Sequence, residues 1–255
     1  MATPGQGDIV TPGMTGSIKA FRRPAPKVQP DYSTLKKLVD SNEFAGQQAL
    51  IIGGSRGLGE VAAKLLAAGG ANVKITYHQG KEDACYIVDD IVSGDGVAAC
   101  LHFDVLNPGV DQQCITENNW VPTHLYYFAT PFIFSAVKGI FSPELFNKFI
   151  SYYVVGFINT VNQLRDLGLR SIFYPSSVAI DELPLNMGEY AASKMAGEIL
   201  CTFLGKSLRE IKIYKPRLPR VATDQTVSLM PVANQDATQI MLEHLRLFRN
   251  LQFED

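Results

Sequence analysis

The chain has 255 residues, of which 46% are hydrophobic and 19% charged, and its formal net charge is −2. This size suits one large domain with a sizeable core, or one domain plus an extension. The near-neutral charge and the lack of a long basic run argue against a nucleic-acid surface. No apolar run is long enough to span a bilayer, and no signal-peptide core follows the early charges. We therefore expect a cytoplasmic protein without a membrane partner.

The residues that most often bind metals or form disulfides are scattered along the chain. The four cysteines form no C-x-x-C pair, and each lies within or beside an apolar segment. This pattern favours free thiols in a reducing compartment over disulfides or metal binding. The four histidines lack ligand spacing, so we expect no zinc site. The cysteines are Cys85, Cys100, Cys114 and Cys201.

The N-terminal part of the chain differs in composition from the rest. Residues 1–30 are rich in proline and glycine and poor in large apolar residues, which predicts an extended tail. A short helix is expected over residues 31–41, and it could dock on the main domain or on a partner. The sequence thus divides into an N-terminal extension, residues 1–45, and a main domain, residues 46–255.

From residue 46 onward, short apolar strands alternate with amphipathic helices. The expected strands cover residues 49–52, 73–77, 97–105, 125–129, 171–174 and 211–215. The expected helices cover residues 58–68, 81–92, 142–166, 187–209 and 234–249. This alternation predicts an α/β fold: a Rossmann-type doubly wound parallel sheet of six or seven strands with helices on both faces.

A glycine-rich loop follows the first expected strand. Its glycines have the spacing G-x-x-x-G-x-G, which allows a tight turn, close approach of a pyrophosphate and tight packing of the next helix. The helix N-terminus adds N–H donors and a positive dipole. The alternative is a tight strand–helix turn without a ligand. The candidate nucleotide-binding residues are Gly53, Ser55, Arg56, Gly57, Leu58 and Gly59.

The end of the second expected strand indicates which nucleotide would bind. A carboxylate there would bind a ribose 2′-hydroxyl, but no acid occurs before Glu82. Arg56, His78 and Lys81 could instead clamp a 2′-phosphate. We therefore predict NADP(H) over NAD(H), although His78 and Lys81 could also be ordinary solvated loop residues.

Three side chains suggest acid–base chemistry. Tyr190 and Lys194 are four residues apart on an expected helix and so share one face. The ammonium would lower the pKa of the phenol, as acid–base catalysis near neutral pH requires. Plain amphipathic helices often carry the same pair. Ser177 ends an expected strand at the edge where open α/β sheets bind ligands, and its hydroxyl could donate to a carbonyl oxygen.

The glycine loop, Ser177, Tyr190 and Lys194 together resemble the short-chain dehydrogenase/reductase family, over about residues 46–225. The resemblance implies that Tyr190 donates or accepts the proton, that Lys194 lowers its pKa and binds the nicotinamide ribose, and that Ser177 orients the substrate carbonyl. Ser176 is the adjacent alternative to Ser177. The resemblance also places Asp104, Val105 and Ala129 at the cofactor, with capping of the next loop as the alternative role of Asp104.

The chain departs from the family pattern at several positions. Thr130 follows Ala129 where the family has a glycine, and Tyr153 stands near the position of the family's catalytic asparagine. Arg217 follows Pro216 where the family often has a glycine. Glu198, four residues after Lys194, is reminiscent of a branch of the family that modifies sugar nucleotides.

The sequence therefore predicts an NADPH-dependent oxidoreductase that transfers hydride between nicotinamide and a small carbonyl or alcohol substrate. One alternative is a non-catalytic or weakly active cofactor-binding subunit, which the departures and the N-terminal extension would fit. A weaker alternative, resting on Glu198, is an epimerase or dehydratase. The long apolar helices are compatible with a homodimer or homotetramer, and the N-terminal tail could contact a partner.

Overall fold

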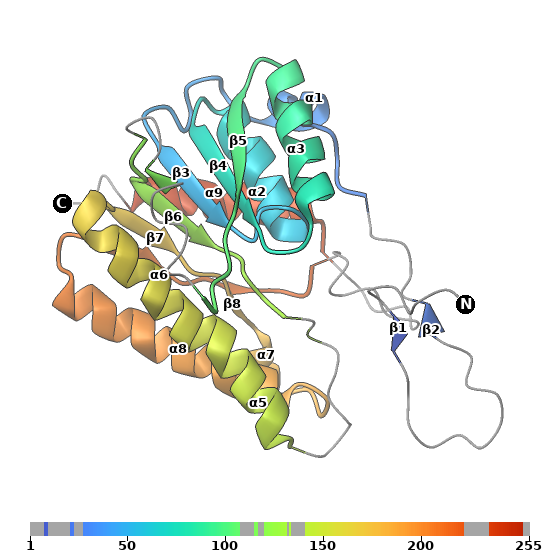
Figure 1. The fold of residues 1–255 in the computed structure, drawn as a ribbon, viewed down its shortest axis with the longest axis vertical. Coiled ribbons are helices and arrows are strands. Elements are labelled where there is room, and N and C mark those ends of the chain that lie inside the picture. Colours follow the sequence, from blue (N-terminus) through green and yellow to red (C-terminus); the bar gives the residue numbers. More distant parts are fainter. Residues whose placement is uncertain are drawn as a thin grey trace.

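A parallel β-sheet forms the centre of the molecule (Figure 1). The computed structural model describes residues 28–107, 115–116, 120–131, 133, 141–221 and 235–251, and the backbone of 8–9 and 21–22. Its six strands lie in the order β5-β4-β3-β6-β7-β9. They are β3 (Gln48–Ile52), β4 (Asn72–Tyr77), β5 (Val97–His102), β6 (His124–Tyr127), β7 (Ser171–Phe173) and β9 (Lys212–Tyr214). The first strand of this sheet in sequence, β3, lies in its middle. The chain then adds β4 and β5 toward one edge and β6, β7 and β9 toward the other. This order confirms the predicted Rossmann-type topology.

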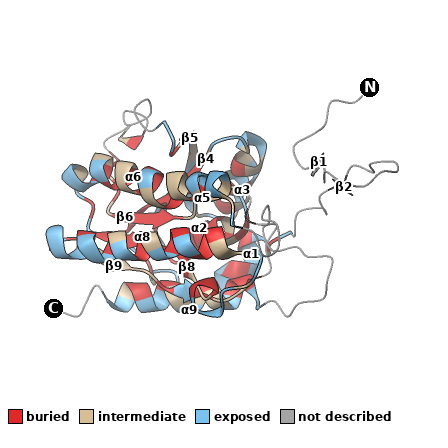
Figure 2. Cartoon of the chain, turned by 90° about the horizontal axis from the view of Figure 1, so that it is seen from below, coloured by how far each residue is buried: buried red, intermediate tan, exposed pale blue. Residues whose placement is uncertain are grey.

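Helices cover both faces of the sheet (Figures 1 and 2). Alternate residues of each strand point to opposite faces, so Ala49 and Ile51 join one core while Leu50 and Ile52 join the other. The first core packs under α2 (Gly57–Ala68), α3 (Lys81–Ser93) and α9 (Ala237–Asn250). The second core packs under α6 (Phe157–Leu164) and α8 (Gly188–Ser207).

The helix expected over residues 142–166 is interrupted in the structure. It consists of α5 (Pro143–Ile150), a π-helical segment (Ser151–Gly156), α6 and a final 3-10 turn (Arg165–Leu167). The hydroxyl of Tyr127 donates to the carbonyl of Tyr152 at 2.7 Å, and that of Tyr174 donates to the carbonyl of Tyr153 at 3.0 Å. Tyr127 of β6 and Tyr174, which follows β7, thus bind carbonyls of the widened segment. Single π-helical turns inside α-helices often occur at functional sites.

Three short elements that the sequence did not predict lie beyond the ends of β7 and β9. The strands β8 (Ser176–Ser177) and β10 (Arg217–Leu218) pair in parallel, and the short helix α7 (Ala179–Glu182) follows β8. This pairing fixes the backbone of Ser177 beside that of Leu218. It therefore positions a candidate catalytic residue at the carboxyl edge of the sheet.

The N-terminal helix docks on the main domain, which is one of the two possibilities that the sequence left open. The helix α1 (Tyr32–Leu35) continues into a 3-10 turn (Lys36–Leu38), and Tyr32 and Leu35 are buried in the first core. The ammonium of buried Lys64 on α2 binds the Pro30 carbonyl at 3.1 Å and the Asp90 carboxylate at 2.9 Å. Farther toward the N-terminus, β1 (Asp8–Ile9) pairs antiparallel with β2 (Phe21–Arg22).

Candidate active site

The glycine loop joins β3 to α2 at the carboxyl edge of the sheet. Gly53 and Gly57 have φ angles of +78° and +58°, which side-chain-bearing residues rarely adopt. A Cβ atom on Gly59 would lie 2.3 Å from the carbonyl oxygen of Gly53, so the backbone of α2 packs directly against the backbone of the loop there. The result is a compact turn that leaves the first N–H groups of α2 pointing at the loop. Ser55 lies against Gly80, and Leu58 packs against the first core.

The basic residues expected to clamp a 2′-phosphate lie on both sides of this loop. The guanidinium of Arg56 donates to the carboxylate of Asp83, in the first turn of α3, at 2.7 Å. His78 is half exposed, with its Nδ1 atom 3.9 Å from the carboxylate of Asp104. Lys81 is exposed at the start of α3. Arg56 therefore has an acidic partner that the sequence analysis did not anticipate.

The three other candidate cofactor residues line different parts of the same edge. Asp104 accepts hydrogen bonds from the backbone of Leu106 at 3.0 Å and the amide of Asn107 at 2.9 Å, so it caps the next loop. Val105 is buried in the second core. The backbone nitrogen of Ala129 would lie 3.0 Å from a Cβ atom on Gly53, so Ala129 borders the glycine loop directly.

Ser177 and Tyr190 come together at the carboxyl edge of the sheet, and the Ser177 side chain acts to lower the pKa of the phenol. The Ser177 hydroxyl oxygen accepts a hydrogen bond from the backbone N–H of Ala179 at 3.2 Å. Tyr190 is 8% exposed and packs in a small aromatic core with Phe149 and Tyr153. The ring centres of Phe149 and Tyr153 lie 5.8 Å and 5.7 Å from that of Tyr190. The neighbouring Ser176 instead donates to the carboxylate of Glu198, so Ser177 is the serine that faces the phenol.

Burial dominates the pKa values of the tyrosine and the lysine. It raises the pKa of Tyr190 to about 12, against an opposing effect of the Ser177 side chain. Burial lowers the pKa of Lys194 to about 7. In this structure burial sets the pKa of Tyr190, and Lys194 is not among the groups that shift it, so the lowering of this pKa by Lys194 stays a prediction.

Lys194 is directed toward other partners than the phenol of Tyr190. Its ammonium donates to the Pro175 carbonyl at 2.7 Å and lies 4.0 Å from the ring centre of Tyr153. The ring centre of Tyr174 is 5.1 Å away, and that of Tyr190 is 6.0 Å away. The faces of two aromatic rings therefore offset part of the cost of burying this cation.

Two departures from the family pattern contact each other. The hydroxyl of Thr130 donates to the Pro131 carbonyl at 3.0 Å and therefore accepts from the hydroxyl of Tyr153. Tyr153 thus fills the space between Thr130, Lys194 and Tyr190, at the position where the family has its asparagine.

Two further unusual residues, Arg217 and Glu198, also form a pair. Arg217 binds both carboxylate oxygens of Glu198 at 2.8 Å and also contacts Asp181 on α7. The Arg217 guanidinium holds the pKa of Glu198 below its usual range. Glu198 therefore has a structural partner, and the pair ties α8 to β10.

The structure adds two residues to the site that the sequence analysis did not identify. The buried Tyr174 supplies an aromatic face to Lys194, and Pro175 supplies its carbonyl acceptor. A Cβ atom on Gly197 would lie 1.9 Å from the Tyr174 hydroxyl, so only glycine lets this hydroxyl reach over α8. A glycine inside a long helix was the one sequence signal for this contact.

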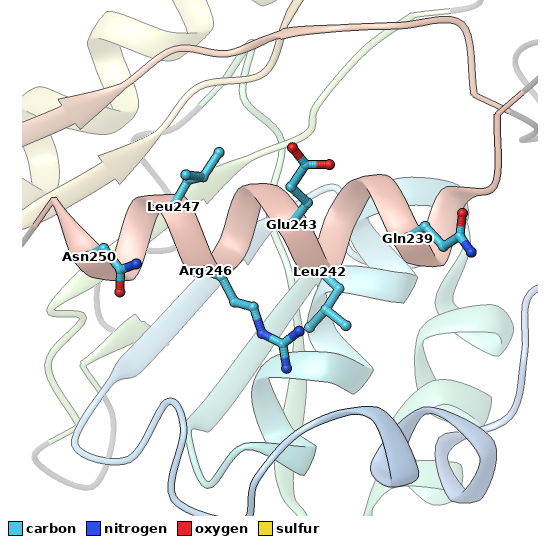
Figure 3. Close-up of a pocket in the computed structure, with 6 residues that line it drawn as sticks. All are labelled: Gln239, Leu242, Glu243, Arg246, Leu247 and Asn250. Atoms are coloured by element: carbon cyan, nitrogen blue, oxygen red, sulfur yellow. The ribbon is translucent and has the colours of Figure 1, made fainter.

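A shallow pocket lies away from this site, on the outer side of α9 (Figure 3). It is lined by Gln239, Leu242, Glu243, Arg246, Leu247 and Asn250. Arg246 is already bound to Glu43 at 2.7 Å, which connects α9 to the segment before β3. In the part of the chain that the structure describes, no cluster of metal-binding side chains occurs, and no helix is long and apolar enough to cross a membrane.

Comparison with curated proteins finds two reductases with detectable sequence similarity, whereas no protein-family model matches the chain. The NADPH-dependent aldehyde reductase 2, chloroplastic, of Arabidopsis thaliana is 29% identical over 190 residues, covering 67% of this chain and 70% of that protein. A probable tetrahydroxynaphthalene reductase of Zymoseptoria tritici is 40% identical over 67 residues, covering 26% of this chain and 25% of that protein.

Solved structures match much more of the chain. A short chain dehydrogenase from Burkholderia cenocepacia in complex with NADP has a TM-score of 0.72 at 24% identity, covering 81% of this chain and 92% of that one. A dehydrogenase/reductase from Sinorhizobium meliloti has a TM-score of 0.73 at 21% identity, covering 87% and 94%. The resemblance inferred from the motifs is thus confirmed at the level of the fold.

Proposed function

We propose that this chain, a divergent relative of the short-chain dehydrogenases/reductases, is an oxidoreductase that reduces a small carbonyl substrate with NADPH. The observation that carries the proposal is the placement of Ser177 beside Tyr190 at the same sheet edge as the glycine loop. Both curated relatives are reductases by name, and one is NADPH-dependent, which supports the same class of reaction.

The residues of the glycine loop fit a dinucleotide. Side chains at Gly53 or Gly59 would fill the space against neighbouring backbone, and α2 directs its N-terminus at the loop. The loop from Gly53 to Gly59 would hold the pyrophosphate. His78, Asp104, Val105 and Ala129 would line the rest of the cofactor, and Tyr190 and Lys194 would hold the nicotinamide ribose. When bound, NADPH supplies the hydride that turns the carbonyl into an alkoxide.

Tyr190 holds the proton that this alkoxide needs. With a pKa of about 12, the phenol is protonated at neutral pH and is ready to donate. Ser177, placed beside the same phenol, can donate to the carbonyl oxygen and orient it. In the opposite direction the same tyrosine would accept the proton. The proposed direction is reduction because both curated relatives are reductases by name.

NADP(H) is the proposed cofactor because Arg56 and His78 border the loop and because several structural relatives are complexes with NADP. The carboxylate of Asp83 is the competing consideration, since it already binds Arg56. A 2′-phosphate would have to share Arg56 with Asp83 or draw it away. The charges around Arg56 should therefore appear as a measurable difference between the affinities for NADPH and NADH.

A second candidate function is cofactor binding without turnover. The observation that favours it is the position of the Lys194 ammonium, which lies nearer the Tyr153 ring than the Tyr190 ring. The near-complete burial of Tyr190 is compatible with the same reading. The epimerase alternative rested on Glu198, and the pairing with Arg217 gives that residue a role outside the chemistry.

The direct test is a Tyr190→Phe variant, assayed for NADPH consumption with a panel of aldehydes and ketones. Loss of the proton donor should lower turnover by roughly 10²- to 10⁴-fold. NADPH should still raise the unfolding temperature as it does in the wild type. Tyr86→Phe, on the exposed side of α3, is the matched control and should keep full activity.

Two outcomes would contradict this proposal. Full turnover of the Tyr190→Phe variant would remove Tyr190 from the chemistry. Tight NADPH binding by the wild type without turnover of any substrate would favour the second candidate. The homodimer or homotetramer, a partner for the N-terminal tail and the cytoplasmic location stay predictions from the sequence.

A further inference from the structure

Two thiols face each other between α3 and β5, outside the proposed catalytic site. The sulfur atoms of Cys85 and Cys100 are 3.9 Å apart, and both side chains are half-buried. A small reagent can therefore reach them, whereas Cys201 is buried in the second core. The two residues are separated by 15 positions and joined by the turn that links α3 to β5.

The elements that carry these thiols lie at the outer part of the fold. Strand β5 is at the end of the sheet order, where it pairs with β4, and α3 packs against it. A disulfide has a sulfur–sulfur distance of about 2.05 Å, so the two sulfurs would have to approach by roughly 1.9 Å. Side-chain rotation with a small shift of an outer helix can supply this movement more easily than a rearrangement of the central strands.

We propose that Cys85 and Cys100 are a redox-active thiol pair that forms a reversible intramolecular disulfide, with a small organic disulfide as the oxidant. The Cys85 thiolate attacks one sulfur of the oxidant, whose sulfur–sulfur bond breaks and releases a thiolate. Cys100 then loses its proton and attacks the Cys85 sulfur, which releases the second thiolate. The two cysteines lose two electrons, and the oxidant becomes two thiols that carry the two protons.

The order of attack follows from the surroundings of the two sulfurs. Burial, together with the adjacent Cys85 thiol, raises the pKa of Cys100 to about 11. Cys100 therefore has little thiolate at neutral pH and is the poorer first nucleophile. In the mixed disulfide, however, the Cys85 sulfur is held beside Cys100, and this proximity favours the second attack.

The disulfide would also affect the first turn of α3. Cys85 lies two residues after Asp83, which binds Arg56 of the glycine loop. A shift of α3 toward β5 would move Asp83 and change the access of Arg56 to a 2′-phosphate. This consequence rests on the proposed cofactor site, but disulfide formation itself does not.

The experiment exposes the full chain to mixtures of oxidised and reduced glutathione, blocks remaining thiols with N-ethylmaleimide and locates linked peptides by mass spectrometry. We expect a Cys85–Cys100 linkage whose fraction rises with the proportion of oxidised glutathione and returns to zero after reduction with dithiothreitol. The Cys201→Ala variant should form the same linkage. The Cys100→Ser variant should instead accumulate glutathione on Cys85.

The proposal would be overturned if Cys85 and Cys100 both remained alkylated in fully oxidised glutathione, or if linkages to Cys114 or Cys201 formed in their place. Circular dichroism of each variant shows whether it is folded. Because the linkage is read by mass, its presence or absence does not depend on reductase activity. A change in NADPH affinity without the linkage would argue against the pair and leave the cofactor site standing.

Discussion

The glycine loop and the tyrosine site lie at the same edge of the sheet, but backbone forms the first and side chains form the second. The loop is backbone: its shape depends on positive φ angles and on the lack of a Cβ atom at Gly59. The tyrosine site consists of side chains, and burial shifts the pKa values of Tyr190 and Lys194 in opposite directions. Steric changes should therefore disable the glycine loop, whereas changes of charge and pH should act on the tyrosine site.

Among changes that act on cofactor binding and stability, the largest effect is expected in the loop, from Gly59→Ala. The added Cβ atom would lie 2.3 Å from the carbonyl oxygen of Gly53, so the backbone must shift. Overpacking of this kind costs roughly 1–3 kcal/mol, which corresponds to roughly a 10- to 100-fold loss of NADPH affinity if the strain falls on the bound state. Calorimetric titration with NADPH measures it.

The matched control for this steric argument is Gly205→Ala on α8. No atom lies within 4 Å of the Cβ position there, so the alanine should leave NADPH affinity unchanged. Unimpaired binding by the Gly59→Ala variant would mean that the loop does not need its close backbone contact.

The next effect is expected from Arg217→Ala, in the side-chain region. This change leaves the Glu198 carboxylate, whose side chain is 8% exposed, without its cation. Removing one partner of a buried pair is destabilising because it leaves the other charge uncompensated, and the partial exposure of Arg217 reduces this loss. Chemical denaturation measures this loss, and Arg165→Ala, which removes an exposed pair with Asp166, should cost far less.

The pair of Arg217 and Glu198 also predicts how the free energy of unfolding changes at acidic pH. Arg217 lowers the pKa of Glu198 in the folded protein from the ordinary value of 4.5. A lowered folded-state pKa gives stability that is complete above the unfolded-state value and is lost as the pH falls below it. The wild type should therefore lose stability below about pH 4.5 more steeply than the Arg217→Ala variant. Equal slopes would show that the pair contributes no linkage.

The Lys194→Met variant should lack a rise in the free energy of unfolding that the wild type shows at alkaline pH. The pKa of Lys194 is about 7 in the folded protein and 10.5 in its ordinary state, so the unfolded chain binds more protons between these values. The free energy of unfolding of the wild type should therefore rise with pH in this window, by at most about 1.4 kcal/mol per pH unit relative to the variant. The exposed Lys206→Met change should leave this rise intact, and a rise that survives in Lys194→Met would contradict the assignment.

The smallest effect is expected from Arg56→Ala. Loss of this cation should weaken NADPH binding by roughly tenfold, about 1.4 kcal/mol, and leave NADH binding nearly unchanged. Asp83→Asn is the informative companion, because it releases Arg56 from its present partner. It should improve NADPH binding, and equal changes for the two cofactors in both variants would argue against a 2′-phosphate site.

The two regions also differ in how far the sequence could predict them. Glycine spacing between a strand and a helix is a local signal, and the loop has the expected form. The proximity of Ser177 and Tyr190 could be expected because Ser177 ends a predicted strand and Tyr190 lies on a predicted helix at the same edge of the sheet. The partners of Lys194 could not be predicted, because Tyr153 lies 41 positions away in the chain and approaches through a π-helical segment. The raised pKa of Tyr190 depends on burial, which spacing does not report.

Under the proposed function, this edge of the sheet carries out hydride transfer and does not merely bind a nucleotide. The decisive measurement supplies NADPH that carries deuterium at both hydrogen positions of nicotinamide C4 and analyses the product alcohols by mass spectrometry. The proposal predicts one deuterium atom at the former carbonyl carbon, formed by the wild type and far more slowly by the Tyr190→Phe variant. Tight NADPH binding with no deuterium in any product would contradict it.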